Sequence, residues 1–115
     1  MAPGIVPDAG DIVWLQFHQK PEARQNEHKP AVVLSAAVYN DATGMVLCCP
    51  LTIRIKGYPF EVDIPAGAGV LGVILSDQLR SLDWRERQAE YAGKVDVGTL
   101  DEVRSKLDAV LHEEG

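Results

Sequence analysis

Residues 45–55 read MVLCCPLTIRI, and this stretch decides the fold. Its residues follow the period of two that is typical of a β-strand. Pro50 lacks an amide hydrogen, so we expect a bulge or a sheet edge at that position. Cys48 and Cys49 would point to opposite faces of such a strand, which predicts two buried, reduced thiols and neither a disulfide nor a metal site.

The segment before this strand predicts two more strands joined by a long polar loop. Residues 11–17, DIVWLQF, are rich in β-branched and aromatic residues, and residues 30–35, PAVVLS, form an apolar run typical of a buried strand. The loop over residues 18–29 is as long as loops that carry function. We expect one helical turn over residues 36–40 and a tight turn over residues 40–44.

The segment after it predicts four further strands and a helix. The strands are expected at residues 56–64, 67–76, 77–84 and 90–95. Gly72 would permit bending or a close approach of two backbones. Thr99 and Glu102 fit a capping box at the start of the helix. Its apolar face would consist of Leu100, Val103, Leu107, Val110 and Leu111. These patterns together describe a mainly β protein, a small and strongly curved barrel with one covering helix.

Length and charge restrict the partners without naming them. The 115 residues suffice for a single domain, residues 1–115, and the net charge of −6 argues against a general coat for nucleic acids. Residues 20–56 nevertheless hold five basic and three acidic side chains. A locally basic cleft therefore stays compatible with a polyanionic partner. No apolar run reaches the roughly 20 residues needed to cross a bilayer and no signal peptide is visible, so we expect a cytoplasmic protein.

Five segments in register resemble the MazF/PemK family of toxin endoribonucleases. They are PDAGDIVWLQF, HKPAVVLSAAVYNDATGM, CPLTIRIKGYPFEV, SDQLRSLDW and the helical tail, in the family's order and spacing across residues 7–112. The resemblance implies an SH3-like β-barrel that pairs as a homodimer. It implies sequence-specific cleavage of single-stranded RNA, including messenger RNA, without a metal or other cofactor. It also implies a MazE-like antitoxin protein that wraps the dimer and blocks the RNA groove.

Such cleavage makes the ribose 2′-hydroxyl the nucleophile and leaves a 2′,3′-cyclic phosphate and a 5′-hydroxyl. It needs a base, an acid for the departing 5′-oxygen, and a group that holds the charge growing on the phosphate. By resemblance, Lys29 stands where the family carries an arginine at the start of the second strand. Thr52 matches the threonine of its P-x-T segment. An ammonium group neutralises a phosphate with less geometric control than a guanidinium fork. We hypothesise that Lys29 is the cationic and acid partner, that Thr52 hydrogen-bonds a phosphate oxygen, and that activity survives.

His28 is a further catalytic candidate, because histidine titrates near neutral pH and can act as acid or base. Neighbours on a strand face opposite sides, however, so His28 and Lys29 need not share a site, and His28 could instead shape the loop. Arg24 occupies a position where some family members carry a glutamate. This departure leaves the general base unidentified and could add phosphate affinity.

Other residues are candidates for holding the RNA. Phe17 could stack on a base, although it could equally end the first strand in the core. Alternation predicts that Thr52, Arg54 and Lys56 share one polar strand face while Leu51, Ile53 and Ile55 point inward. A turn at residues 77–80 could read base edges. The candidate substrate-binding residues are therefore Phe17, Arg24, Gln25, Arg54, Lys56, Asp77, Gln78 and Arg80. Trp14 and Trp84 are expected in the core or in dimer contacts, and Tyr39, Met45 and the C-terminal helix are further candidates for such contacts.

Two alternatives belong to other classes of protein. The same barrel occurs in gyrase poisons of the CcdB type, which rely on a C-terminal tryptophan beside charged residues, whereas this chain ends LHEEG. A catalytically weakened relative that binds only RNA or antitoxin is the other alternative, because Lys29 replaces the family's arginine.

Overall fold

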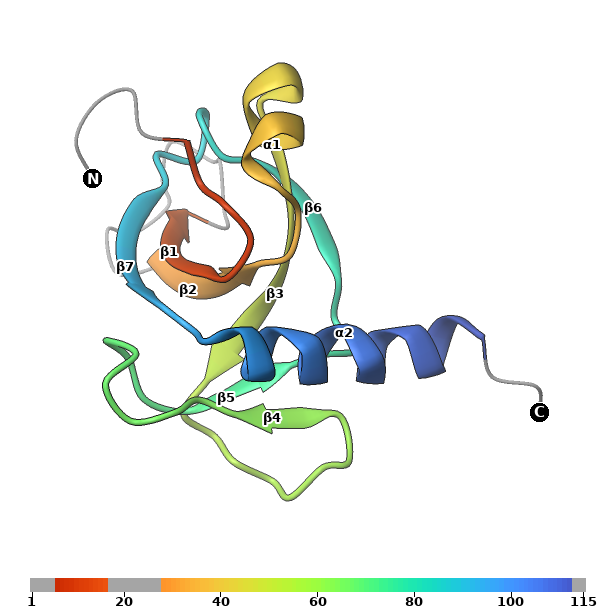
Figure 1. Cartoon of the computed structure of the whole chain (residues 1–115). Coiled ribbons are helices and arrows are strands. Elements are labelled where there is room, and N and C mark those ends of the chain that lie inside the picture. Colours follow the sequence, from red (N-terminus) through yellow and green to blue (C-terminus); the bar gives the residue numbers. More distant parts are fainter. Residues whose placement is uncertain (1–5, 17–27, 113–115) are drawn as a thin grey trace.

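The computed structural model describes residues 6–16 and 28–112. Within these residues, seven strands and two helices form a mainly β structure in which the strands pair antiparallel (Figure 1). In chain order they are β1 (Asp11–Gln16), β2 (His28–Val33), α1 (Ala37–Thr43), β3 (Met45–Thr52), β4 (Glu61–Asp63), β5 (Val73–Leu75), β6 (Arg80–Asp83), β7 (Glu90–Lys94) and α2 (Val97–Leu111).

The long strand β3 organises the sheet. The strand order is β4-β5-β3-β2-β1-β7, and β6 pairs with β3 off this path. Among the described residues no pairing joins the two ends of the path, so the sheet is not closed. Pro50 lies between the part of β3 that pairs with β6 and the part that pairs with β5. The missing amide hydrogen therefore falls where the strand changes partner, and the register with β2 runs without a bulge as far as Pro50, the last pair.

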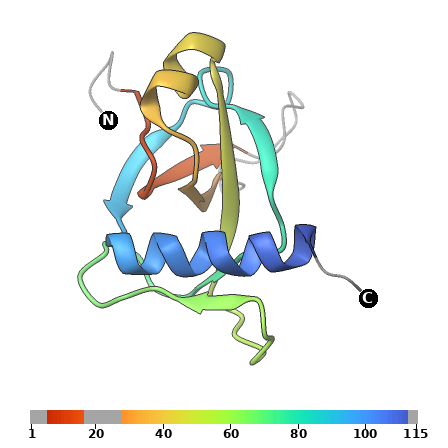
Figure 2. The ribbon, with the colours of Figure 1, turned by 45° about the vertical axis from the view of Figure 1, so that its right-hand side comes forward.

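The two faces of the sheet bury two separate apolar clusters. Ile12 and Cys49 lie in one cluster with Val103 of α2, whereas Val13 and Cys48 lie in the other. Neighbouring residues on one strand thus point into different cores, as alternation requires. Both cysteines are fully buried and reduced, which confirms the expectation for them. Figure 2 shows α2 lying between the β4–β5 pair and the rest of the sheet.

Burial of these thiols predicts that they are chemically inert in the folded protein. Removal from water raises the pKa of Cys48 and of Cys49 to about 12, because the thiolate loses its hydration. At pH 8 each thiol is then protonated far more fully than a free cysteine. We expect a thiol reagent such as DTNB to label the native protein about 1,000-fold more slowly than free cysteine. Labelling should reach two thiols per chain once denaturant is added, and rapid native labelling of either thiol would contradict this burial.

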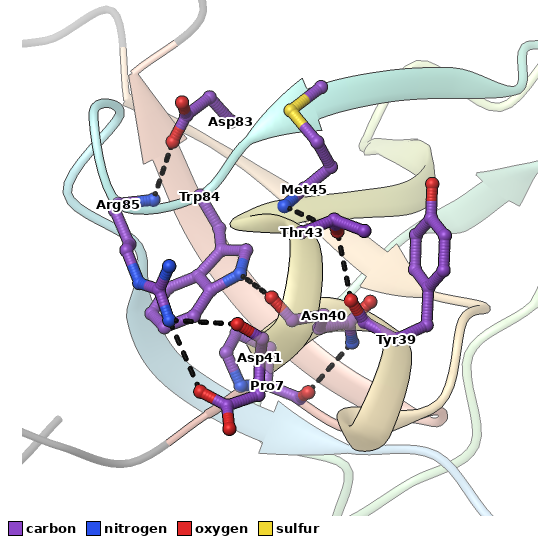
Figure 3. A network of polar contacts seen from close by, with 9 residues as sticks. All are labelled: Pro7, Tyr39, Asn40, Asp41, Thr43, Met45, Asp83, Trp84 and Arg85. Atoms are coloured by element: carbon purple, nitrogen blue, oxygen red, sulfur yellow. Dashed lines mark hydrogen bonds and ion pairs between the residues drawn. The ribbon is translucent and has the colours of Figure 1, made fainter.

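Helix α1 replaces the turn expected at residues 40–44. The backbone stays helical to Thr43 and ends at Gly44, whose φ of 73° is left-handed. Asn40 explains the stability of this short helix, because its buried side-chain amide donates to the carbonyl oxygens of Pro7 (2.8 Å) and Ser35 (3.0 Å). The indole of Trp84 donates to the carbonyl oxygen of Asn40 at 2.9 Å, so the helix is tied to the segment after β6 (Figure 3).

A cation continues this network on the surface. The guanidinium of Arg85 lies 4.7 Å from the ring centroid of Trp84 and forms an ion pair with Asp41 at 3.1 Å. Figure 3 shows the side chains of Arg85 and Asp41 on the same side of α1. Tyr39 is 42% exposed and Met45 is half-buried, so both stay candidates for contact with a second chain.

Further expectations about the elements were also wrong. The strand expected over residues 45–55 ends at Thr52, and those expected over 56–64 and 67–76 shorten to β4 and β5. The capping box is absent from α2, because Asp96 is the N-cap and accepts a hydrogen bond from the backbone N–H of Thr99 at 2.9 Å. The carboxylate of Asp96 satisfies a backbone amide in the first turn of the helix. Thr99 already lies inside that turn, so it is not the N-cap. Val110 and Leu111 lie exposed at the end of α2 and not in the core.

Candidate functional site

A cleft of about 710 Å³ opens beside the ends of β2 and β3. Trp14 from β1, Lys29 from β2, Thr52 from β3 and Arg80 from β6 all contribute to its lining. Strands β2 and β3 pair with Ala31 opposite Pro50, and continuing this register by two residues brings position 29 opposite position 52. The two residues expected to act on one phosphate therefore face the same space.

Lys29 projects into this cleft from an exposed position. Lys29 pairs with Leu15 of β1 and lies two residues before Ala31, so its side chain leaves the sheet on the face that buries both residues, at the edge of that cluster. None of the described residues forms an ion pair with Lys29. Its side chain lies where an anion that enters the cleft can reach it.

Thr52 is the last residue of β3 and is partly buried. Its hydroxyl oxygen accepts a hydrogen bond from the backbone N–H of Arg54 at 3.1 Å. The hydroxyl proton stays available, so Thr52 can donate to a phosphate oxygen in the cleft. Gly72 makes this position possible: a Cβ added there would lie 2.3 Å from the carbonyl oxygen of Thr52.

A second pocket of about 240 Å³ adjoins the cleft. Thr52, Leu75 and Gln78 border both spaces, and Arg54 and Lys56 line the second one. Thr52, Arg54 and Lys56 thus meet, as expected from the sequence. The strand alternation given as the reason was wrong, however, because β3 ends at Thr52, before Arg54 and Lys56.

The burial predicted for Ile53 and Ile55 was wrong for the same reason. They were expected to point inward, yet Ile53 is 80% and Ile55 is 64% exposed. Beyond Thr52 the chain has no ladder partner that could impose alternation. The residues after β3 must therefore be held in place by other contacts.

The turn between β5 and β6 supplies the remaining described candidates. Gln78 is exposed and borders both pockets, and Arg80 lines the cleft. Asp77 has a different surrounding, because its carboxylate accepts a hydrogen bond from the hydroxyl of Tyr58 at 2.8 Å. This bond raises the pKa of Tyr58, since it stabilises the protonated phenol beside a negative charge.

His28 does not line the cleft that Lys29 and Thr52 share. It opens β2 opposite Gln16, is half-buried, and is not among the residues that line the cleft. Phe17, Arg24 and Gln25 fall outside the described residues. Trp14 was expected in the core or a dimer contact; it is 36% exposed and lines the cleft, so it is not a core residue. A tryptophan flanked by buried Val13 and Leu15 on a strand of period two carried that signal.

The described residues contain neither a group of metal ligands nor a membrane-spanning helix. Across residues 6–16 and 28–112, no three histidine, cysteine, aspartate or glutamate side chains are grouped so that they could hold a metal ion. Within the same ranges no helix has the length and apolar character needed to cross a bilayer. The polar and aromatic groups that line the cleft include the cations of Lys29 and Arg80, the hydroxyl of Thr52 and the ring of Trp14.

Comparison with known proteins places the chain. Residues 8–111 match the family described as PemK-like, MazF-like toxin of type II toxin-antitoxin system. The chain is 42% identical over 111 residues to the endoribonuclease toxin MazF of Escherichia coli K12, covering 96% of this chain and 99% of that protein.

Solved structures agree with this match. The chain is similar to the crystal structure of MazE-MazF (Form-II) from Deinococcus radiodurans, with a TM-score of 0.84 and 49% identity over 96% of this chain and 99% of that one. It is also similar to the crystal structure of MazF (Form-I) from the same organism, with a TM-score of 0.83 and 51% identity over 93% of this chain and 97% of that one. Sequence and fold thus agree over nearly the whole length, and the chain belongs to the PemK-like, MazF-like toxins of type II toxin-antitoxin systems.

Proposed function

We propose that this chain is a sequence-specific, metal-independent endoribonuclease toxin that cuts single-stranded RNA, including messenger RNA. The observation that carries the proposal is that Lys29 and Thr52 line one cleft. The E. coli relative is named an endoribonuclease toxin, which supports the same activity here.

The chemistry follows from the groups that face the cleft. The 2′-oxygen attacks the adjacent phosphorus, its proton passes to a base, and the bond from phosphorus to the 5′-oxygen breaks. The ammonium of Lys29 balances the charge that grows on the phosphate and supplies the proton that the departing 5′-oxygen takes up. The hydroxyl of Thr52 donates to a phosphate oxygen. The products are a 2′,3′-cyclic phosphate and a 5′-hydroxyl, and the base is not assigned to a residue.

Neighbouring groups hold the rest of the strand. Arg54 and Lys56 offer cations in the adjoining pocket, and Gln78 offers an amide where the two spaces meet. Trp14 adds an aromatic face on which a base can stack, a contact typical of proteins that bind single strands. Phe17, Arg24 and Gln25 stay candidate RNA contacts, and His28, which does not line the cleft, supports the strand end and carries no proton in the reaction.

The proposal includes finer statements about fold and assembly. Residues 1–115 form one toxin domain with an SH3-like barrel, act as a homodimer, and work in the cytoplasm. The strongly curved antiparallel sheet and the likeness to solved MazF structures support the barrel. Exposed side chains on α1 and beside it offer apolar area for a dimer contact.

A MazE-like antitoxin is the proposed protein partner. The D. radiodurans structure is a MazE-MazF complex, which supports such a partner for this chain. Exposed Ile53 and Leu71 border the cleft, which is also lined by the cations Lys29 and Arg80. An acidic segment of the antitoxin could cover both features at once and exclude RNA.

The direct test is incubation of the purified protein with a long single-stranded RNA in EDTA, followed by mapping of the cut ends. We expect cuts at one short sequence motif, with 2′,3′-cyclic phosphate and 5′-hydroxyl ends. Loss of all cutting in EDTA with recovery on adding a divalent metal would contradict the metal-free mechanism. Intact RNA together with inhibition of DNA gyrase would instead favour a poison of the CcdB type.

The lysine in place of the family's arginine predicts a specific response. A Lys29→Arg variant should cut at least as fast as the wild type and up to about ten-fold faster, because a guanidinium holds a phosphate by two parallel hydrogen bonds. Initial rates on the same RNA measure the effect. A wild type that is inactive beside an active Lys29→Arg variant would show that this chain is the catalytically weakened relative.

A further inference from the structure

The segment after β3, residues 53–60, carries two of the cations proposed to hold RNA yet has no regular structure. Residues 53–59 are all exposed, and none of residues 53–60 belongs to a described strand or helix. Such a segment samples many conformations unless particular contacts restrict it. The contacts that do so determine where Arg54 and Lys56 lie.

One restraint is a carboxylate at the start of β4. The side chain of Glu61 accepts hydrogen bonds from the backbone N–H groups of Lys56 and Gly57, both at 3.1 Å, one on each oxygen. Two oxygens holding two consecutive amides fix both the position and the direction of the backbone at Lys56. The hydroxyl of Tyr58, bonded to Asp77, is a second restraint on the same stretch.

A third restraint on residues 53–60 comes from helix α2. The ammonium of Lys106 donates to the carbonyl oxygen of Pro59 at 2.7 Å and to that of Glu61 at 3.3 Å. Glu102, one turn earlier, forms an ion pair with Lys106 at 3.8 Å and keeps it pointing toward the segment. α2 is itself anchored in the core through Leu100 and Val103, so it offers a rigid support.

We propose that Lys106 and Glu61 are positioning residues that hold residues 53–60 in the conformation that places Arg54 and Lys56 beside Thr52. The inference rests on the proposed function for its effect on RNA, but the restraint itself is independent of RNA. Glu61 lines the second pocket beside these cations, whereas Lys106 lies outside both pockets. A residue on α2 therefore governs how tightly RNA binds without touching the cleft.

This role differs from a general contribution to stability. Lys106 is partly exposed, its side chain being 31% accessible, and it contacts backbone carbonyls of the segment and not the apolar core. Removing its charge should loosen residues 53–60 while leaving α2 folded. The expected kinetic effect falls on binding and thus on KM, since Lys29 and Thr52 keep their places.

The test compares Lys106→Met, which keeps the aliphatic stem, with Lys106→Arg and with the control Lys94→Met. Lys94 on β7 loses the same charge from a pair with Asp11 of β1 at 4.0 Å, in which the lysine side chain is 59% and the aspartate side chain 12% accessible. In Lys106→Met we expect hydrogen exchange at the amides of Lys56 and Gly57 to accelerate about ten-fold. KM for RNA should rise about five-fold with kcat within about two-fold of the wild type. Lys106→Arg should restore both quantities, and Lys94→Met should change neither.

Several outcomes would overturn the inference. Unchanged exchange at Lys56 and Gly57 in Lys106→Met, or a KM equal to that of Lys94→Met, would do so. If Lys106→Met fails to fold, Glu61→Gln takes its place, because it removes the charge and one acceptor but leaves α2 intact; normal protection of the two amides in Glu61→Gln would also overturn it. If the wild type cuts no RNA, the proposed function fails, and the exchange measurement still decides whether Lys106 and Glu61 hold the segment.

Discussion

A Lys29→Met variant is expected to cut RNA at least about 100-fold more slowly than the wild type. Removal of one group that stabilises the developing charge of a transition state costs on the order of 10²–10³ in rate. Lys29 is exposed, lines the cleft and forms no ion pair with the described residues. Methionine keeps a side chain of similar length, so the cleft should keep its shape.

The measurement is the initial rate of cleavage of one RNA at saturating and at limiting concentration. Lys94→Met is the matched control, because it loses the same charge from β7, away from the cleft. The control should cut at the wild-type rate. A Lys29→Met variant that cuts within about three-fold of the wild type would remove Lys29 from the chemistry.

A Gly72→Ala variant is expected to lose both stability and activity. Gly72 has φ of 126°, a conformation that residues with a Cβ rarely adopt, and the added carbon would meet the carbonyl oxygen of Thr52 at 2.3 Å. Relief of that clash requires the end of β3 or the start of β5 to move. We expect a loss of about 3 kcal/mol in the free energy of unfolding, combining backbone strain with the displaced strand.

Gly67→Ala separates the two causes of this loss. Gly67 also has a left-handed φ, of 88°, but nothing lies within 4 Å of the Cβ that would be added. It should lose about 1 kcal/mol, which is the strain alone, and keep full activity. Denaturant unfolding with a parallel cleavage assay measures both effects. Equal losses of stability in the two variants would show that the approach of Gly72 to Thr52 has no energetic consequence.

The strands with strong alternation could be read from the sequence. β3 follows the period of two, and the burial of Cys48 and Cys49 on opposite faces confirms that pattern, whereas β1 was recognised from its β-branched and aromatic residues. The pairing of Lys29 with Thr52 across one cleft rested on family resemblance, because strand alternation alone cannot state which strand ends meet.

The segment after β3 could not be read in this way. Residues 53–56 continue an alternating pattern of apolar and polar side chains, yet residues 53–60 lack a neighbouring strand, and alternation has meaning only within a ladder. Their position depends on Glu61 and on Lys106, which lies 45 positions further along the chain. A contact between a helix lysine and backbone carbonyls leaves no periodic signal in a sequence. The capping of α2 by Asp96 was missed for a different reason, since the capping box offered at Thr99 was an equally plausible start.

The most direct test of the whole account is a double-mutant cycle of Lys29→Met and Thr52→Ala on the rate of RNA cleavage. Groups that act together on one phosphate lose their effects as a unit, so the double variant should be within about three-fold of the slower single variant. Full multiplication of the two single losses would mean that the ammonium and the hydroxyl act at separate places, and that the cleft they share is not where the strand is cut.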